Sequence, residues 1–300
     1  MVPVRVAVTG GEGLIGAAVG QALATRGIRV TSVDWRDGGT DVADARIVET
    51  LNAAVPDVVV HAAAHPGGRS LAEPIEDVRI NALGSMRVFD WCARAKVPVV
   101  FTSSSIVYGE QPAGSIPETA SLRPGTIYGV AKVACENWLA ILQSGYGLEW
   151  TVLRLFATYG SGHRPNTYQG IVNVMLTQLL AGNRVVVRGS LDRQRDMIYV
   201  EDAAEAVAEA VCRPAARGQI LNVGTGTAVT IRELIYTICH LLGRPLDEVE
   251  IVEEAGTIGD PQSNVADATK AATVLGFSSK FSITQGLQAV IKQRSLTLSP

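Results

Sequence analysis

Residues 9–16 read Thr-Gly-Gly-Glu-Gly-Leu-Ile-Gly and stand between a short apolar run and a longer run with helical spacing. Gly10, Gly13 and Gly16 have separate uses in such a stretch. One permits a tight turn, one admits a pyrophosphate to the backbone, and one lets helix and strand pack closely. The helix that follows offers free N–H groups to phosphates. Because an acid, Asp34, ends the next apolar run, the context predicts a dinucleotide-binding strand–helix–strand unit.

The rest of the first half repeats this alternation of β-branched runs and longer Ala-rich runs. The predicted strands are 4–9, 29–34, 58–62, 99–103 and 150–156, and the predicted helices are 14–26, 75–96 and 128–143. Alternating strands and helices predict an α/β fold with a doubly wound, parallel Rossmann sheet, because helices then cover both faces of the strands.

After Tyr159 the alternation breaks at a polar, turn-rich loop, residues 160–166. Beyond the loop the predicted helices are 171–181 and 231–242, and the predicted short strands are 184–188 and 249–253. We interpret this part as a smaller C-terminal α/β substrate-binding lobe. The predicted division is a Rossmann domain over 1–157, to which 197–223 returns, and a substrate-binding lobe over 158–196 and 224–300.

Composition excludes several classes of protein. Of 300 residues, 47% are hydrophobic and 18% charged, which supports a large core and excludes a disordered chain. A net charge of -3 without a long basic run argues against a nucleic-acid partner. No apolar stretch reaches the length of a membrane span, and a strand begins too early to leave room for a signal peptide. We therefore expect a cytoplasmic protein with no membrane partner. The four cysteines lack metal-site spacing, so no metal is expected.

Tyr128 and Lys132 lie four residues apart on a predicted helix, so their side chains share one face. A neighbouring ammonium favours the phenolate, and we expect it to lower the pKa of Tyr128 and make this residue a base. The spacing alone is also common on solvated helix faces. Ser104 follows the strand at 99–103, at the edge where parallel sheets bind ligands. A turn with local serine hydrogen bonds is the competing interpretation.

Asp34 is placed to accept hydrogen bonds from the hydroxyls of an adenosine ribose. A 2′-phosphate beside this carboxylate would be repelled. Arg36 weakens the argument without replacing the acid, so the sequence favours NAD over NADP as the cofactor.

Several further motifs follow in order along nearly the whole chain. They are Asp41-Val42, residues 61–64 (His-Ala-Ala-Ala), Asn81, residues 103–109 (Ser-Ser-Ser-Ile-Val-Tyr-Gly), residues 154–156 (Arg-Leu-Phe), residues 195–202 (Arg-Asp-Met-Ile-Tyr-Val-Glu-Asp), Gly259-Asp260 and Asp267. Together with the motifs above, they resemble the extended short-chain dehydrogenase/reductase family, and within it the NAD-dependent sugar-nucleotide epimerase and dehydratase group.

The resemblance implies roles for individual residues. The catalytic set would be Ser104, Tyr128 and Lys132. The motifs and the resemblance give as cofactor-binding residues Gly10, Gly13, Leu14, Ile15, Gly16, Asp34, Asp41, Val42, Ala62, Ala63, Ala64, Asn81, Tyr128, Lys132 and Phe156. The implied substrate-binding residues are Ser104, Ser105, Tyr128, Val172, Arg188 and Arg195. The resemblance also implies a homodimer that pairs the helices around 78–95 and 128–143.

Three positions depart from the family pattern. An Asp-Glu pair follows the catalytic hydroxyl in the 4,6-dehydratases, whereas Ser105 and Ile106 stand here, which disfavours that reaction. Ala157 replaces an asparagine of many epimerases, and the arginine usual before Gly259-Asp260 is missing. Each of these two differences removes a side chain that would hold a substrate diphosphate. Arg188 and Arg193 are the candidates to replace them, alongside Arg195, which matches an arginine that grips the diphosphate.

The leading hypothesis is an NAD-dependent epimerase of a nucleotide sugar, acting at C4 through a transient ketone. Tyr128 would take the hydroxyl proton as hydride moves to NAD, and Ser104 would hydrogen-bond the reacting oxygen. The alternative is an NAD-dependent dehydrogenase or reductase of a sugar, sugar acid or other small alcohol, which the missing phosphate ligands favour. A non-catalytic dinucleotide-sensing protein is least favoured, because Ser104, Tyr128 and Lys132 are all present.

Overall fold

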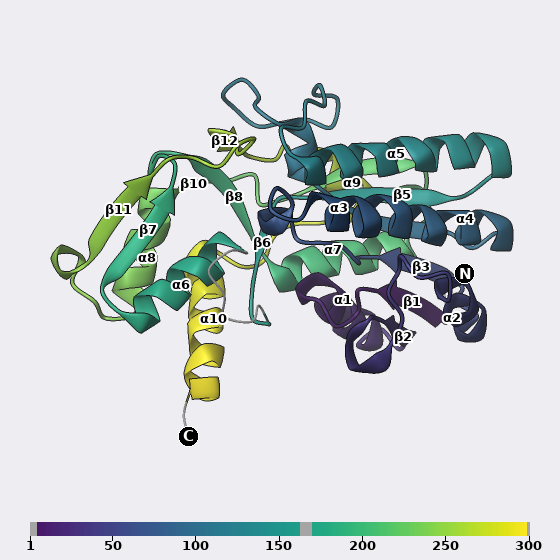
Figure 1. Cartoon of the computed structure of the whole chain (residues 1–300), viewed down its shortest axis with the longest axis horizontal. Helices are drawn as coiled ribbons and strands as arrows, with labels where there is room; N and C mark the ends of the chain where they lie inside the picture. Colours follow the sequence, from purple (N-terminus) through teal and green to yellow (C-terminus); the bar gives the residue numbers. More distant parts are fainter. Residues whose placement is uncertain (1–4, 163–169, 299–300) are drawn as a thin grey trace.

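The computed structural model describes residues 5–162 and 170–298. Its centre is a six-stranded sheet in the order β2-β1-β3-β4-β5-β9, with every neighbouring pair parallel (Figure 1). The strands are β1 (Arg5–Thr9), β2 (Arg29–Val33), β3 (Val58–His61), β4 (Val99–Ser104), β5 (Trp150–Leu155) and β9 (Gln219–Val223). This arrangement confirms the predicted α/β class and the doubly wound Rossmann sheet.

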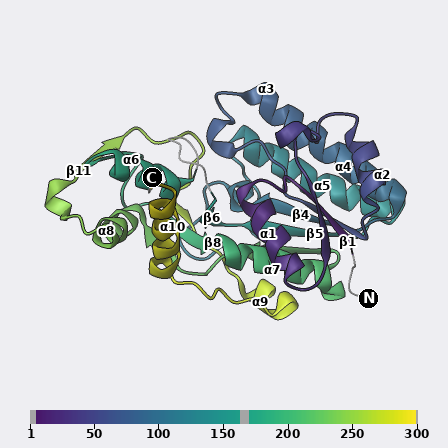
Figure 2. The same ribbon diagram turned by 90° about the horizontal axis from the view of Figure 1, so that it is seen from below.

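Helices cover both faces of the sheet, as Figure 2 shows edge-on. Val6 and Val8 of β1 pack in one apolar cluster and Ala7 packs in the other, because successive strand residues face opposite sides. The first cluster is closed by α1 (Leu14–Ala24), α7 (Val200–Cys212) and α9 (Thr269–Leu275). The second is closed by α2 (Ile47–Ala54), α4 (Ser85–Ala95) and α5 (Ile127–Tyr146).

The predicted helix 75–96 is helical over its expected length but not uniform. It consists of α3 (Pro74–Asp77), a π-helical segment η3 (Val78–Gly84), and α4. Helix α5 extends the predicted 128–143 at both ends. It begins after Thr126, whose hydroxyl accepts the Gly129 N–H, and ends at Gly147, whose φ is 71°.

A smaller lobe lies beside one end of the sheet (Figure 1). Its strands β6 (Ala157–Tyr159), β8 (Gln194–Tyr199), β10 (Ala228–Thr230) and β12 (Ser263–Asn264) pair around β8. Strands β7 (Arg184–Arg188) and β11 (Glu250–Glu254) form a separate parallel pair. Helices α6 (Ile171–Ala181), α8 (Ile231–Leu241) and α10 (Ile283–Leu298) enclose a third apolar cluster with these strands.

The chain passes between the two parts more than once. After β5 it builds β6 to β8 in the lobe, and it then returns to the main sheet as α7 and β9. The return begins at Val200, since residues 197–199, predicted to belong to the Rossmann part, pair with β6 in the lobe. The division into two domains otherwise stays a prediction.

Candidate active site and cofactor cleft

The glycine loop between β1 and α1 leaves no room for side chains. Gly10 has a φ of +70°, and a Cβ there would lie 2.6 Å from the backbone of Ala63. A Cβ on Gly16 would overlap the Gly10 carbonyl. Gly13 is the N-cap of α1, and as a glycine it has no side chain to accept hydrogen bonds from the first N–H groups of the helix. The first-turn N–H groups therefore face an open approach suited to a phosphate.

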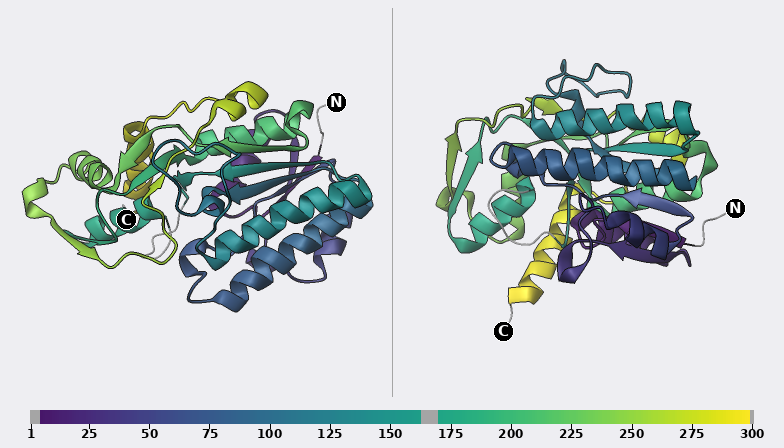
Figure 3. Two further views of the ribbon diagram at one scale, coloured as in Figure 1. Left: turned by 90° about the horizontal axis from the view of Figure 1, so that it is seen from above. Right: turned by 45° about the vertical axis from the view of Figure 1, so that its right-hand side comes forward.

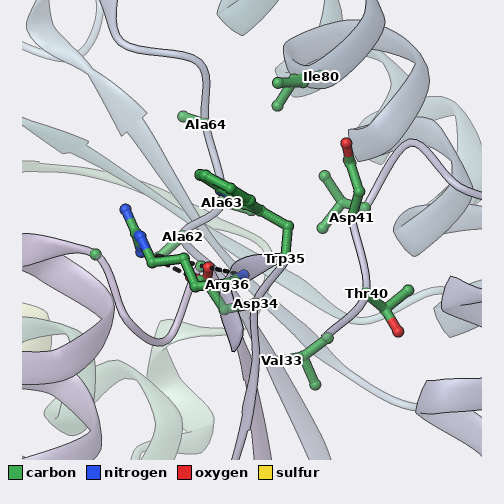
Figure 4. A pocket seen from close by; sticks show the side chains of 13 residues that line it. Val33, Asp34, Trp35, Arg36, Thr40, Asp41, Ala62, Ala63, Ala64 and Ile80 are labelled. Carbon is green, nitrogen blue, oxygen red and sulfur yellow. Dashed lines mark hydrogen bonds and ion pairs between the residues drawn. The ribbon is translucent and has the colours of Figure 1, made fainter. Parts of the chain in front are cut away.

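An open cavity of about 490 Å³ adjoins this loop, where the strand order reverses between β1 and β3 (Figure 4). It is lined by Gly10, Gly13, Val33, Asp34, Trp35, Arg36, Thr40, Asp41, Val42, Ala62, Ala63, Ala64 and Ile80. Eight of the predicted cofactor residues are among them. The sequence reasoning missed Trp35, although its place directly after Asp34 is a usable signal.

The Asp34 carboxylate lies at the end of β2 and faces the glycine loop. It accepts the Glu12 N–H at 3.1 Å. It also accepts a hydrogen bond from the Arg36 guanidinium at 3.2 Å (Figure 4). Asp41 is held similarly, by the Ala43 N–H at 2.8 Å and by Arg79 at 2.7 Å. An acid beside a glycine cradle that excludes any Cβ fits a dinucleotide with free ribose hydroxyls, as NAD has.

Two predicted cofactor residues have other contacts. Asn81 is buried, and its amide bonds to both backbone groups of His65, at 2.8 and 3.1 Å, so it fixes the loop after β3. Phe156 is 2% exposed and packs near Tyr108. Leu14 and Ile15 lie in the first turn of α1 and pack against the apolar clusters. Their contacts to a cofactor stay predictions.

The structure brings Ser104, Tyr128 and Lys132 together at the carboxyl end of β4. The Lys132 ammonium lies 5.5 Å from the centre of the Tyr128 ring and donates to the Thr102 carbonyl at 2.9 Å. The Ser104 hydroxyl hydrogen-bonds the Tyr128 phenol and accepts the Ile106 N–H at 3.3 Å. These contacts bring the three predicted catalytic residues within reach of one ligand.

Burial dominates the ionisation of this group. It lowers the pKa of Lys132 to about 8. Burial also raises the pKa of Tyr128 above its ordinary value, and the charge of Asp77 raises it further, while the hydrogen bond from Ser104 opposes both. The expected lowering of the Tyr128 pKa by Lys132 is therefore wrong for the chain alone. The cause is the loss of water around the phenol.

A buried polar network holds the end of β4 in place. Glu136, one turn after Lys132 on α5, accepts the Ser103 hydroxyl at 2.5 Å and the Arg154 guanidinium at 2.7 Å. Arg154 also donates to the Tyr108 hydroxyl at 2.9 Å. The network therefore fixes Ser103 and, with it, the neighbouring Ser104 at the end of β4. Beyond the Arg-Leu-Phe motif, the sequence carries no signal for this network.

His61 at the end of β3 forms a second buried anchor. Its ring nitrogens lie 2.6 Å from the Thr9 hydroxyl and 2.9 Å from the Ser85 hydroxyl. Burial, helped by the charge of Lys132, lowers the pKa of His61 to about 3, so the ring is neutral. Thr9 and Ser85 therefore hold β1, β3 and α4 together around a neutral imidazole.

The predicted substrate residues do not all meet. Arg195 and Arg193 share the carboxylate of Asp260, with Arg195 at 2.6 Å. The neighbouring Gly259 packs on Gly125, just before α5, where a Cβ would lie 2.7 Å away. Asp260, which binds both arginines from the start of β8, therefore lies on the loop that borders the start of the Tyr128 helix.

Arg188, Val172 and Ser105 lie elsewhere or are enclosed. Arg188 ends β7, is exposed, and faces Glu254 at 4.0 Å. Val172 is 2% exposed within the lobe cluster. Ser105 is buried, and its carbonyl accepts from Asn264 at 3.4 Å. Substrate contacts at these three positions stay predictions.

Within residues 5–162 and 170–298, no group of His, Cys, Asp and Glu side chains is arranged to hold a metal ion. No helix in that part of the chain is long and apolar enough to cross a membrane. Residues 163–166 of the predicted polar loop, including His163 and Arg164, lie outside the described residues.

Comparison with known proteins agrees with this geometry. The model of the NAD dependent epimerase/dehydratase family matches residues 6–224. The UDP-glucose 4-epimerase of Mycolicibacterium smegmatis is 30% identical over 96% of this chain and 97% of its own. The UDP-glucose 4-epimerase of Thermotoga maritima with UDP-glucose is 28% identical, with a TM-score of 0.91 over 98% of this chain and 100% of its own. The corresponding Thermus thermophilus enzyme with NAD is also 28% identical, with a TM-score of 0.87 over 96% and 98%.

The glycine cradle, the acid at the end of β2 and the Ser–Tyr–Lys group thus occur on a fold shared over nearly the full length of these relatives. The cofactor is NAD. The chain belongs to the NAD dependent epimerase/dehydratase family.

Proposed function

We propose that this protein is an NAD-dependent epimerase of a nucleotide sugar, acting at C4 of the sugar. The observation that carries the proposal is the meeting of Ser104, Tyr128 and Lys132 in a chain that also has a cleft that fits NAD and a buried Arg193–Arg195 pair. Relatives named UDP-glucose 4-epimerase, at 30% identity or slightly below, support the same reaction.

The residues divide the chemistry among them. NAD, when bound, supplies an acceptor and donor of hydride. Tyr128 exchanges a proton with the substrate hydroxyl, and Ser104 hydrogen-bonds the reacting oxygen. Lys132, anchored at Thr102, places a positive charge beneath the phenol. A ketone held in the site can then be reduced on either face, which inverts the carbon without net oxidation.

The substrate diphosphate is proposed to bind at the shared carboxylate of Asp260. Arg193 and Arg195 together carry more positive charge than this one carboxylate neutralises. Guanidinium groups bind phosphate oxygens in paired hydrogen bonds. We assign to Arg193, rather than to the exposed Arg188 on β7, the phosphate binding that Ala157 and Thr257 cannot provide.

A net NAD-dependent dehydrogenase is the second candidate. Ala157 and Thr257 favour it, because both lack the side chain that would hold a diphosphate in many relatives. In that case a sugar, sugar acid or small alcohol would be oxidised, and the cofactor would exchange in each cycle.

We propose a homodimer formed through α4, η3 and α5, which run side by side along one side of the molecule (Figure 3). Large apolar side chains of η3, α5 and the adjoining α3 are exposed, namely Ile75, Val78, Leu83, Val130 and Ile141. Exposed apolar groups gathered on neighbouring helices suit a protein interface.

The four free cysteines suit the reducing cytoplasm, which we propose as the location.

The first experiment supplies the purified protein with UDP-glucose or UDP-galactose and follows product identity together with absorbance at 340 nm. Interconversion without lasting NADH supports the epimerase. NADH that accumulates only when NAD and another alcohol are added supports the dehydrogenase instead.

Tyr128→Phe should lower kcat by about 10²- to 10⁴-fold, because the proton donor and acceptor is lost. Tyr146→Phe, at the exposed end of α5, is the control and should leave kcat unchanged.

A further inference from the structure

Asp77 is a carboxylate in a place that suits an apolar side chain. It is the buried residue of α3 and is fully enclosed, whereas Ile75 on the same helix is 81% exposed. Neither of its carboxylate oxygens has a hydrogen-bond partner among the described residues. A buried carboxylate without donors is costly unless a nearby positive charge compensates it. We therefore expect a positively charged group that compensates Asp77 in the surrounding helices.

The partner lies on α5, against which α3 packs. The charge of Asp77 acts on both Lys132 and Tyr128 there. Lys132 is 2% exposed, and its ammonium is paired with no carboxylate by direct contact within the described residues. Glu136 also acts on Lys132, but Arg154 already neutralises it through three nitrogen–oxygen contacts. Among the described residues, Asp77 is thus the carboxylate acting on this ammonium that no hydrogen bond or ion pair engages.

The other titratable groups around the pair are neutral or already paired. Burial raises the pKa of the Cys135 thiol of α5 to about 11. Burial lowers the pKa of His61 of β3 to about 3. Arg79 of η3 bonds to Glu76 and Asp41. None of these groups cancels the effect of the carboxylate on the ammonium and the phenol.

We propose that Asp77 is a positioning residue of the active site, whose buried carboxylate keeps the Lys132 ammonium charged and keeps the proton on Tyr128 between transfers. A negative charge in a medium of low dielectric constant favours a charged ammonium and a neutral phenol. Any further positive charge in the cleft would favour loss of a proton from the Lys132 ammonium and from the Tyr128 phenol. The carboxylate of Asp77 opposes this effect. The kinetic part of this inference rests on the proposed function, and the titration of Lys132 does not.

The test is the titration of Lys132 in protein labelled with ¹³C at the lysine Cε, without substrate. The chain has five lysines, and Lys132→Arg identifies the resonance of interest. Lys132 should titrate near pH 8 in the wild type. Asp77→Asn should lower this pKa by about one unit or more, and Asp77→Glu should restore most of it. Asp90→Asn, which removes an exposed carboxylate of α4, should leave it unchanged.

The second readout is the pH profile of kcat/KM for interconversion. Asp77→Asn should shift its limbs toward lower pH in step with the Lys132 titration, which a purely structural role would not do. An unchanged Lys132 titration in Asp77→Asn would overturn the inference. If Asp77→Asn does not fold, Asp77→Ser is the second uncharged variant. If the wild type interconverts no nucleotide sugar, the proposed function fails, and the titration still decides the role of Asp77.

Discussion

Arg193 is a residue whose importance depends on its neighbour rather than on its own motif. It shares the Asp260 carboxylate with Arg195 and is almost fully buried there. Arg193→Ala should raise KM for a nucleotide sugar by about 10- to 100-fold, because a charged hydrogen bond to phosphate contributes roughly 1.5–3 kcal/mol. The effect on kcat should be smaller.

Arg188→Ala is the matched control, since Arg188 is exposed and pairs only loosely with Glu254. Steady-state kinetics of both variants with the same substrate separate the two arginines. Equal KM values for the wild type and Arg193→Ala would show that the diphosphate binds elsewhere.

His61 makes stability depend on pH. Its pKa is lowered from 6.5 to about 3 in the folded chain, so the unfolded chain takes up the proton first as the pH falls. The stabilisation by neutral His61 is therefore complete above pH 6.5 and is lost progressively toward pH 3. By pH 5 the loss should be about 2 kcal/mol.

The substitution His61→Gln tests this, because an amide can still bond to the Ser85 hydroxyl but does not titrate. Urea unfolding between pH 7 and pH 5 should show a smaller loss of stability in the variant. Parallel curves for the two proteins would mean that other groups cause the acid sensitivity.

The residues of the site differ in how visible they are in the sequence. The glycines of residues 9–16 and the four-residue spacing of Tyr128 and Lys132 are local patterns, and the predicted meeting with Ser104 is found in the structure. The ionisation of Tyr128 was not predictable in this way. It depends on burial and on Asp77, which reaches α5 only through packing of α3.

At the scale of elements, α1 contains two glycines with opposite roles. A Cβ on Gly16 would overlap the Gly10 carbonyl, whereas a Cβ on Gly20 would meet only a Val30 methyl at 3.6 Å. Gly16→Ala should therefore destabilise the fold by about 1–3 kcal/mol and weaken NAD binding at least about tenfold. Gly20→Ala should stabilise by up to about 1 kcal/mol, since alanine is the better helix former.

Chemical denaturation and NAD titration of the two variants check this contrast. If Gly16→Ala binds NAD as tightly as Gly20→Ala does, the glycine loop does not form the phosphate site.

Length explains which elements could be predicted. Strands β1 to β5 of the main sheet were predicted, and with four to six residues each they are long enough to show a pattern, whereas β9, also five residues long, was not among the predicted strands. Strands β6, β10 and β12 have only two or three residues, and their pairing with β8 arises from tertiary contacts. The π-helical segment η3 escaped prediction, because helical spacing in a sequence does not distinguish α from π geometry.

At the scale of the whole molecule, the exposed apolar side chains of η3 and α5 predict association. Ile141→Asp places a charge on the proposed interface and should convert a dimer to a monomer, because an unpaired charge is costly there. Ile258→Asp alters an equally exposed isoleucine of the late loop and should leave the assembly unchanged. Sedimentation velocity of the wild type and both variants measures the outcome. A monomeric wild type would contradict the proposed interface.

The return of the chain to the main sheet also bears on its synthesis. Strand β5 ends at Leu155, but its neighbour β9 begins only at Gln219. A ribosome needs roughly 3 to 13 seconds for the intervening stretch at ordinary rates of elongation. Throughout this interval the nascent sheet exposes an open edge of backbone donors and acceptors, the kind of edge that recruits other strands. During this period, a chaperone that covers the open edge of β5 favours folding of the nascent chain over aggregation.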